Sequence, residues 1–432
     1  MDRFIKNVYF LIILIFSGRA TVFYQSQEGI IFIFLLTVIL WFYFHKPIGK
    51  SYGIVVGVWL IYCAMVFLRN GEFTPFFYFR YLTYITVAYL LVNLFREHLF
   101  LKFEKTVYVL AFISLFFYTW QVVSTESLFQ FARMLDVSGE MGRRSEEYRN
   151  FLIYTIENHG RDYLNRNYGF VFEPGSYSVY LSLAMLFNLL RTKINLKPKG
   201  NLPLYILGLA LITTYSTTGY AALGLLVVYL AFRDIKGWSK YVYLLVGITV
   251  VVYFYFKLDF MHNKIEELYV QGQDIEEVID RAAKSGSSYS GGRFGGFIIG
   301  WNDFIQFPLL GRGGVTILSS GMVGQGKVYI VNGLANIMSQ FGLFGLVVFF
   351  YFLYKSSVQL AHYFQSKALY AFFIVIMVGM TAFSIHYHYI LFTIMFYSLY
   401  SIKGTFYYKT QNKSLKERNE NTFIYRIPSF RR

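Results

Sequence analysis

The arginines of this chain have the clearest chemical potential, because several lie inside or beside strongly apolar stretches. Arg80 lies in Phe77-Tyr-Phe-Arg-Tyr-Leu-Thr, about one and a half helical turns into such a stretch. A charge at that depth in a membrane is costly and marks a functional candidate. It either faces a cavity and binds an anionic group or extends its guanidinium to the interface. Arg19 and Arg69 lie nearer to the ends of their stretches, where extension to the interface is favoured.

Three further arginines lie where polar segments meet, or approach, apolar ones. Arg166 ends the first polar segment, and Arg293 and Arg312 lie in the second. A guanidinium stays charged and grips phosphate oxygens in a bidentate fork. Several of them converging with Arg80 would suit a pyrophosphate, especially one that becomes a leaving group. The alternative for each is a solvated charge in a loop.

Glu173 is the first candidate for a general base. It precedes Pro174-Gly175-Ser176 at the start of an apolar stretch. Proline is favoured in the first helical turn, and a carboxylate there interacts well with the helix dipole. Glutamate is nevertheless a poor N-cap, so a catalytic use stays open: a partly buried carboxylate could accept the proton of a sugar hydroxyl.

The composition is that of a membrane protein. Of 432 residues, 56% are hydrophobic, 21% aromatic and only 15% charged, against roughly 25% charged in a soluble domain. A single cysteine, Cys63, excludes a disulfide framework and a cysteine metal site. The net charge of +16 lies mainly in short connections and the C-terminal stretch. That distribution is typical of residues that set membrane orientation, so no nucleic-acid partner is expected.

The apolar stretches predict an all-α polytopic membrane protein, because a helix needs about 20 mostly apolar residues to cross a bilayer. About twelve spans are predicted, and residues 4–24 are interpreted as the first of them rather than as a cleavable signal peptide. The spans are 4–24, 29–45, 51–69, 74–95, 106–123, 168–190, 202–215, 218–232, 241–257, 329–354, 368–385 and 388–403.

Lysine and arginine are concentrated in alternate connections, which places both termini in the cytoplasm and both long polar segments outside. The predicted regions are 1–123 with helices one to five, 124–167 as a first extracytoplasmic loop, 168–257 with helices six to nine, 258–328 as a large extracytoplasmic loop, 329–403 with helices ten to twelve, and 404–432 as a basic cytoplasmic tail.

Two other patterns carry less chemistry. His386 and His388 are two residues apart with no Cys or Asp cluster, so packing at the interface is favoured over a metal site. The Gly/Ser-rich segment Ser285–Gly296, predicted to be a loop, lacks the Lys-Ser/Thr ending of a phosphate-binding loop and any strand–helix context. ATP-driven function is therefore disfavoured, and no cofactor is expected.

Three local motifs follow one another along the chain. The first is Gly169-Phe-Val-Phe-Glu173-Pro174-Gly175-Ser176-Tyr at the entry to a middle span. The second is Arg293 followed by Trp301 and Pro308-Leu-Leu-Gly311-x-Gly313. The third is Asn332 followed by Gln340-Phe-Gly342-Leu-Phe-Gly345. With the many-span plan and the two long outer loops, they resemble the Wzy-type polysaccharide polymerases and the related O-antigen ligases.

This resemblance implies a GT-C-like membrane fold and a metal-independent glycosyltransferase. Such an enzyme joins oligosaccharide repeat units carried on undecaprenyl pyrophosphate at the outer face of the plasma membrane, in O-antigen, capsule or exopolysaccharide synthesis. The expected partners are the lipid-linked donor and acceptor and the bilayer, and a chain-length regulator stays open. Arg80, Arg166, Arg293 and Arg312 would bind pyrophosphate. Glu173, and after it Asp303, would be the base.

The chain also departs from the family pattern. It has Ser216-Thr-Thr-Gly219 where the ligases and many relatives have Ser-Arg-Gly, and Val331 where the ligases carry a histidine. Both differences favour a polymerase over a ligase. A flippase of lipid-linked oligosaccharides is the third alternative, but two large outer loops favour an enzyme.

Overall fold

The structure, a computed structural model, places most of the chain in a helical bundle. It describes residues 1–71, 74–138, 148–158, 164–193, 195, 197–234, 237–238, 241, 245, 288–290, 292–314, 322–323 and 326–400. The predicted tail 404–432 lies outside these residues, as do most of the predicted span 241–257 and most of the large loop 258–328.

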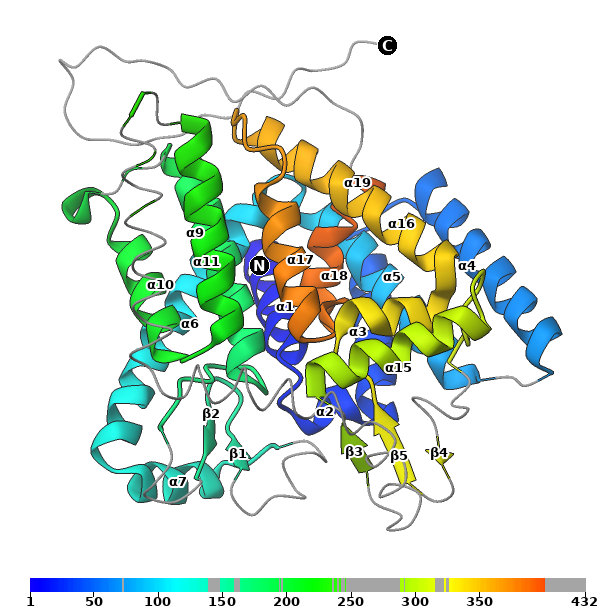
Figure 1. The fold of residues 1–432 in the computed structure, drawn as a ribbon, viewed down its shortest axis with the longest axis horizontal. Helices are drawn as coiled ribbons and strands as arrows, with labels where there is room; N and C mark the ends of the chain where they lie inside the picture. Colours follow the sequence, from blue (N-terminus) through cyan, green and yellow to red (C-terminus); the bar gives the residue numbers. More distant parts are fainter. Residues whose placement is uncertain are drawn as a thin grey trace.

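Helices form nearly all of the described regular structure (Figure 1). Their bounds are α1 Asp2–Ser17, α2 Val22–Gln25, α3 Gln27–Tyr43, α4 Lys50–Asn70, α5 Pro75–Phe95, α6 His98–Val123, α7 Thr125–Met134, α9 Pro174–Thr192, α10 Leu202–Thr213, α11 Thr217–Asp234, α15 Gly292–Gln306, α16 Gly333–Tyr363, α17 Ala371–Ala382, α18 Tyr389–Met395 and α19 Tyr397–Tyr400. Two short 3-10 turns, η1 Pro198–Gly200 and η2 Ile385–Tyr387, complete the set.

The polar segments add two small sheets that the all-α prediction did not include. In the first segment, β1 Tyr148–Asn150 pairs antiparallel with β2 Thr155–Glu157 and packs with α7 around a small apolar core of its own. In the second, β3 Ser288–Ser290 runs parallel to β5 Gly326–Tyr329, and β4 Met322–Val323 is antiparallel to β5. The described parts of both segments lie at the same end of the bundle, along the lower edge of Figure 1.

Helix boundaries follow local chemistry. α9 begins at Pro174 rather than at 168, because proline fits the first helical position and residues 164–173 run without regular structure. The expected polar break within 202–232 is present, since α10 ends at Thr213 and α11 begins at Thr217. The first predicted span is divided at Arg19, whose φ of 62° is incompatible with a continuing α-helix. The last divides into α18 and α19 at Phe396.

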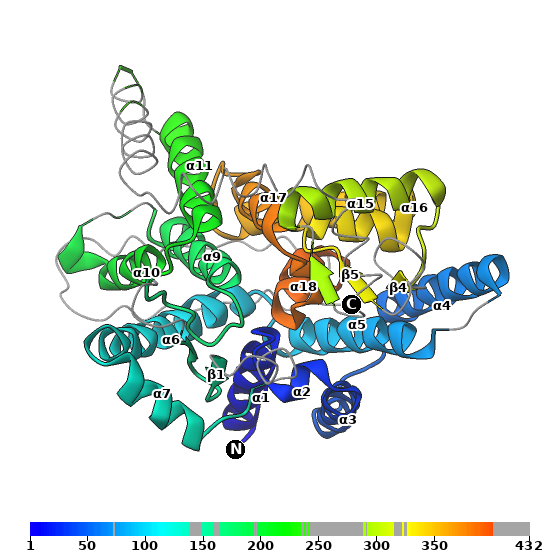
Figure 2. The same ribbon diagram turned by 60° about the horizontal axis from the view of Figure 1, so that its bottom comes forward.

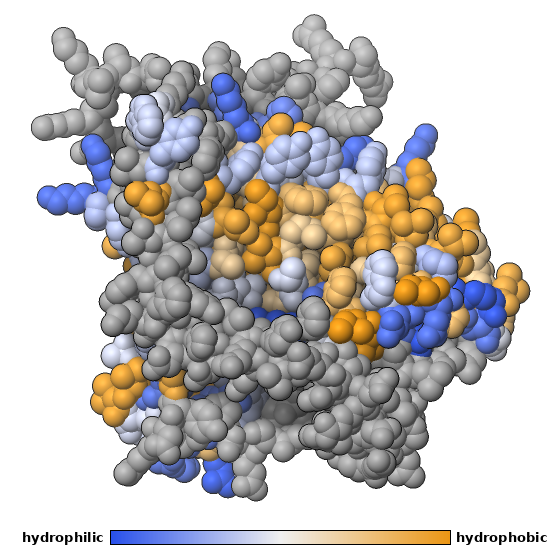
Figure 3. All heavy atoms as spheres, viewed as in Figure 1, coloured by the Kyte–Doolittle hydropathy of each residue, from blue (hydrophilic) through white to orange (hydrophobic). Residues whose placement is uncertain are grey.

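The described surface has the apolar character of a membrane protein. Four helices, α4, α5, α6 and α16, are long and apolar enough to cross a bilayer. Shorter apolar helices include α3, α10, the first part of α11 and α17. Apolar side chains gather over the face formed by α16 and α4, between bluer margins above and below (Figure 3). The full count of twelve spans stays a prediction.

A break in α16 joins two of the sequence motifs into one structural unit. Gly342 has φ 59° and ψ −151°, so the helix is interrupted there. The freed amides of Leu343 and Phe344 donate to the carbonyls of Pro308 (2.7 Å) and Leu309 (3.1 Å). The freed carbonyl of Gln340 in turn accepts from the amide of Gly313 (2.8 Å). The loop after α15 thus satisfies the backbone groups of a broken span, as irregular backbone at membrane depth requires.

Close packing of α15 against α16 sets the position of that loop. The two helices lie alongside each other in both ribbon views (Figures 1 and 2). Gly296 and Gly300 face the start of α16, and a Cβ at Gly300 would come within 2.7 Å of Ala335. Asn332 caps α16 by accepting from the Ala335 amide (3.0 Å). The first residue of α15, Gly292, lies inside the segment that the sequence predicted to be a Gly/Ser-rich loop.

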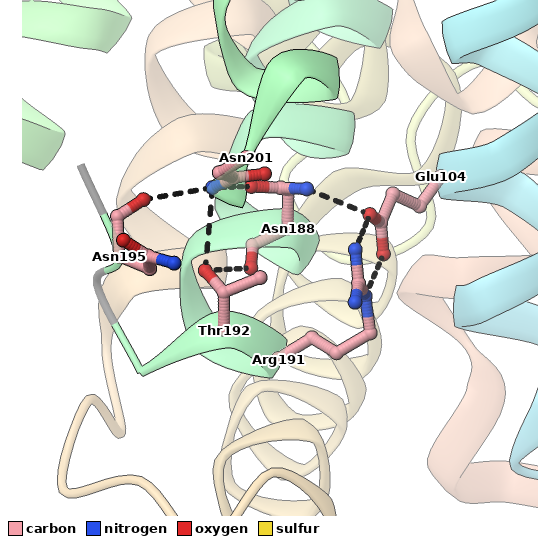
Figure 4. A network of polar contacts seen from close by, with 6 residues as sticks. All are labelled: Glu104, Asn188, Arg191, Thr192, Asn195 and Asn201. Atoms are coloured by element: carbon pink, nitrogen blue, oxygen red, sulfur yellow. Dashed lines mark hydrogen bonds and ion pairs between the residues drawn. The ribbon is translucent and has the colours of Figure 1, made fainter. Parts of the chain in front are cut away.

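At the opposite end of the bundle, a polar network ties α6, α9 and the start of α10 together (Figure 4). Glu104, 2% exposed, accepts two hydrogen bonds from the Arg191 guanidinium (2.6 and 2.9 Å) and one from Asn188 Nδ2 (2.9 Å). The Asn201 amide nitrogen then donates to Asn188 Oδ1 (2.7 Å). Both oxygens of the buried carboxylate are satisfied by protein groups.

Candidate active site

Glu173 occupies the N-cap position of α9 but does not cap it. Its backbone is extended, with φ −133° and ψ 135°, and its side chain makes no cap hydrogen bond. Pro174 at the first helical position has no amide hydrogen, so this helix start has one fewer donor to satisfy. The partly buried carboxylate instead lies near the charge of Arg293, with which it interacts electrostatically.

Arg293 and Arg166 approach the start of α9 from two separate polar segments. Arg293, in the first turn of α15, donates from Nη1 to Thr218 Oγ1 (3.2 Å). A Cβ placed on Gly175 would lie 3.5 Å from Arg293 Nη2, so this guanidinium rests against the first turn of α9. Burial lowers the pKa of Arg293; Glu173 opposes this effect and the nearby charge of Arg166 adds to it. We call Arg166, Glu173 and Arg293 the arginine–glutamate cluster.

The break between α10 and α11 positions Arg166. Its Nε and Nη2 donate to the carbonyls of Thr214 and Tyr215, each at 3.1 Å. Carbonyls at a helix end lack intrahelical partners and accept such bonds readily. The polar Thr213–Gly219 stretch is therefore the docking point of Arg166 and, through Thr218, of Arg293.

Arg80 belongs to a second group of residues. Its guanidinium carbon lies 5.0 Å from the centre of the Phe76 ring, and its charge interacts with the phenols of Tyr24, Tyr84 and Tyr387. Among the described residues, no group accepts a hydrogen bond from its buried Nε. A desolvated cation next to phenols rather than carboxylates is a binding candidate for an anion.

Arg19, expected at the interface, joins the same group. Its guanidinium carbon lies 5.3 Å from the centre of the Tyr24 ring and 5.5 Å from that of Tyr387. We call Arg19, Tyr24, Arg80, Tyr84 and Tyr387 the arginine–tyrosine cluster. Its tyrosines are held firmly, because Tyr24 Oη and Tyr84 Oη both donate to the Tyr387 carbonyl (2.8 and 3.1 Å).

The two clusters are neighbours along a backbone contact. The amide of Phe172 donates to the carbonyl of Gly18 at 2.8 Å, which places the residues before Arg19 and Glu173 against each other. Arg19, which contacts Tyr24 and Tyr387, therefore directly follows a residue that is bound to the chain beside Glu173. The sequence assigned no chemistry to Arg19. Its inward direction depends on its positive φ and on contacts with the Tyr24 and Tyr387 rings, which are distant in the sequence or not visible from it.

His386 and His388 are buried in the protein, and their place at the membrane interface stays a prediction. They are 3% and 1% exposed in and after η2. His388 Nδ1 shares a hydrogen bond with Tyr180 Oη (3.1 Å), whereas neither ring nitrogen of His386 has a partner among the described residues. Burial, with the charge of Arg19 adding to it, lowers the pKa of His386 to about 3, so its ring is neutral at physiological pH.

Asp303 and Arg312 are bound to each other, apart from the two clusters. Arg312 Nη2 forms an ion pair with Asp303 Oδ1, and Ser339 Oγ donates to Asp303 Oδ2 (2.5 Å). Both side chains are buried, at 0% and 4% exposure. Burial raises the pKa of Asp303 to about 6, against the opposing effects of Ser339 and Arg312. Asp303 in α15 therefore binds both Arg312 in the loop that follows α15 and Ser339 in α16.

Arg69 serves the same loop. Its Nη2 donates to the carbonyl of Gly311, and its guanidinium lies 5.0 Å from the Phe307 ring centre. The expected position of this exposed residue at the membrane interface stays a prediction. Of the four arginines predicted to converge, the structure therefore brings Arg166 and Arg293 together, places Arg80 beside Arg19, and pairs Arg312 with Asp303. The described residues contain no group of three or more His, Cys, Asp or Glu side chains that could hold a metal ion.

Comparisons with protein-family models, with curated proteins and with solved structures gave no match. The resemblance to the Wzy-type polymerases therefore rests on the motifs of this chain and on their order and spacing in the sequence.

Proposed function

We propose that this protein is a polysaccharide polymerase, a glycosyltransferase that joins undecaprenyl-pyrophosphate-linked oligosaccharide repeat units. The observation that carries the proposal is the arginine–glutamate cluster. A carboxylate that does not cap its own helix lies near Arg293, and Arg293 in turn lies near Arg166, an arginine from the other polar segment. Acid–base chemistry next to a cationic site is what transfer from a pyrophosphate carrier needs.

The proposed reaction is a displacement at the anomeric carbon of the donor. The acceptor hydroxyl oxygen forms the new bond to this carbon while the bond from carbon to the pyrophosphate oxygen breaks, and the electron pair leaves with the pyrophosphate. The hydroxyl proton moves to the Glu173 carboxylate and later to solvent. Arginine charges stabilise the departing pyrophosphate. Asp303 fits the base role less well, because Arg312 and Ser339 already occupy its two oxygens.

The proposed setting is the bacterial plasma membrane, with a GT-C-like plan of about twelve spans, cytoplasmic termini and both large loops outside. The described parts of the two polar segments lie at one end of the bundle, which supports their facing the same side (Figure 1). Donor and acceptor on lipid carriers would then reach the clusters from the outer leaflet.

Deleting the gene and separating the surface glycan by gel electrophoresis tests the function. We expect glycan that carries a single repeat unit in place of a length ladder. A ligase would instead leave full polymer on the lipid carrier, and a flippase would leave repeat units on the inner side. An unchanged ladder would overturn the polymerase proposal.

Arg293→Ala, expressed in the deletion strain, tests the site. We expect loss of polymer at normal protein level, because the side chain has one described hydrogen bond and its removal also relieves the burial of a charge. Arg133→Ala is the matched control, an exposed arginine in α7 at the same end of the bundle. A full ladder in Arg293→Ala would remove this arginine from the mechanism.

A further inference from the structure

Basic side chains gather at the end of the bundle that carries the Glu104 network. They come from the starts of α1 and α6 and from the turns after α3 and α5, and we call them the basic cluster: Arg3, Lys6, Lys46, Arg96, Lys102 and Lys105. None of the described ion pairs involves any of the six. The positive charge of the cluster is therefore not balanced by an ion pair within the described part of the chain.

One half of the cluster surrounds Lys46 in the turn after α3. Burial lowers the pKa of Lys46, and the nearby positive charges of Lys6 and Arg96 lower it further. Lys6 Nζ lies 5.1 Å from the centre of the Phe44 ring, so this lysine extends from α1 toward the end of α3. We call Lys6, Lys46 and Arg96 the Lys46 group. An anion bound between these side chains would relieve their repulsion.

The other half surrounds Lys102 near the start of α6. The charge of Lys102 interacts with those of Arg3 and Lys105, and we call these three residues the Lys102 group. The two groups adjoin along α1, because Arg3 and Lys6 are three positions apart and therefore share one face of that helix. The cluster thus offers two neighbouring places for negative charge.

Two acidic residues lie beside the cluster in the sequence, and both face tyrosines. Asp2 accepts a hydrogen bond from Tyr43 Oη (3.3 Å), and the charge of Glu97 interacts with the phenol of Tyr397. Even with both carboxylates ionised, the six basic side chains outnumber them. The patch therefore attracts anions.

An exposed apolar stripe on α3 leads to the basic cluster. Leu35, Ile39 and Phe42 are all exposed, and their spacing places them on one face of the helix. α3 lies at the outer edge of the bundle in Figure 2, and α1 is joined to it by a hydrogen bond between Tyr9 Oη and Thr37 Oγ1 (3.0 Å). In a bilayer, the stripe would meet acyl chains and the basic cluster would meet headgroups.

We propose that the basic cluster binds cardiolipin, a phospholipid whose two phosphates are joined by one glycerol, in the leaflet at this end of the bundle. One phosphate lies in the Lys46 group and the other in the Lys102 group, while acyl chains lie along the stripe on α3. Basic surfaces of membrane helices bind such headgroups. Two adjoining groups favour this lipid over one with a single phosphate, because only a shared headgroup engages both at once. The inference is independent of the proposed polymerase activity.

Binding of cardiolipin to the purified full-length protein, measured by native mass spectrometry, tests the inference. We expect the parent protein to prefer cardiolipin to phosphatidylglycerol at equal concentration. The double variant Lys6→Gln/Lys46→Gln should weaken cardiolipin binding about tenfold or more and remove most of this preference, because one phosphate site is lost. Lys197→Gln/Lys199→Gln is the matched control, since it removes two charges from exposed lysines beside η1, at the same end of the bundle.

A second double variant, Arg3→Gln/Lys105→Gln, tests the other phosphate at two exposed positions of the Lys102 group. It should lose as much cardiolipin binding as the first, and it carries the test alone if the first has a lowered melting temperature. Three results would overturn the inference: equal loss of binding in the control, unchanged binding in either variant of the cluster, or a parent protein that binds phosphatidylglycerol as tightly as cardiolipin.

Discussion

Two buried polar regions at opposite ends of the bundle differ in how their charges are satisfied. In the network around Glu104, both carboxylate oxygens receive hydrogen bonds from Arg191 and Asn188 (Figure 4). In the arginine–tyrosine cluster, Arg80 has no carboxylate partner among the described residues, and its Nε has no acceptor.

We interpret the Glu104 network as structural and the arginine–tyrosine cluster as a candidate binding site. A fully satisfied network holds α6, α9 and α10 in register and has little capacity left for a ligand. A buried guanidinium nitrogen without an acceptor costs stability, and such a group is a candidate for binding an anion. The hydroxyls of Tyr24 and Tyr84 donate to the Tyr387 carbonyl, so these side chains surround Arg80 without supplying a counter-charge.

The largest effect on stability is expected at the satisfied end. Glu104→Ala would leave Arg191 and Asn188 without their shared acceptor and lower the free energy of unfolding by about 3 kcal/mol. The value lies at the low end for a buried pair because the Arg191 side chain is 30% exposed and can reach water. Protein level and the melting temperature of the purified protein measure it.

Glu104→Gln is the matched control for that change. It keeps an acceptor oxygen for Arg191 and should lose clearly less stability than Glu104→Ala. If Glu104→Ala is as stable as the parent protein, the network is not what joins these helices, and the contrast between the two regions fails.

The Asp303–Arg312 pair is an intermediate case and predicts a smaller, pH-dependent effect. Burial raises the pKa of Asp303 from 3.8 to about 6, so the folded protein takes up this proton more readily than the unfolded chain. Its contribution to stability is thus fully present below pH 4 and is lost as the pH rises through about 6. As the pH rises over this range, the melting temperature of the parent protein should therefore fall relative to that of Asp303→Asn. A shift in the parent's favour would contradict the raised pKa.

The sequence predicted much of the bundle because helix length, proline and polar breaks act locally. The break between α10 and α11 and the broad positions of α3, α4 and α5 follow from such signals. The grouping of Arg166 and Arg293 was expected from their places beside apolar stretches. Glu173 was expected as a poor N-cap, and the absence of a cap bond agrees.

Pairings across the fold could not be predicted in the same way. Arg19 faces Tyr387, Arg312 faces Asp303, and Gln340 in α16 accepts a hydrogen bond from Tyr81 in α5. Each depends on which helices become neighbours, and no spacing in a single segment carries that information. Gly311 and Gly342 enter the sequence interpretation only as parts of motifs, whereas both have positive φ and Gly342 breaks α16.

The central claim is that Arg80 binds a ligand, and the most direct measurement combines glycan length with protein stability in Arg80→Gln. The account predicts a length ladder that collapses to single repeat units while the melting temperature stays close to that of the parent. Among the described contacts, the change removes a cation–π contact with Phe76, worth about 0.5–1 kcal/mol, and the interaction of the charge with the neighbouring tyrosines. A full ladder, or a melting temperature that falls as far as in Glu104→Ala, would contradict it.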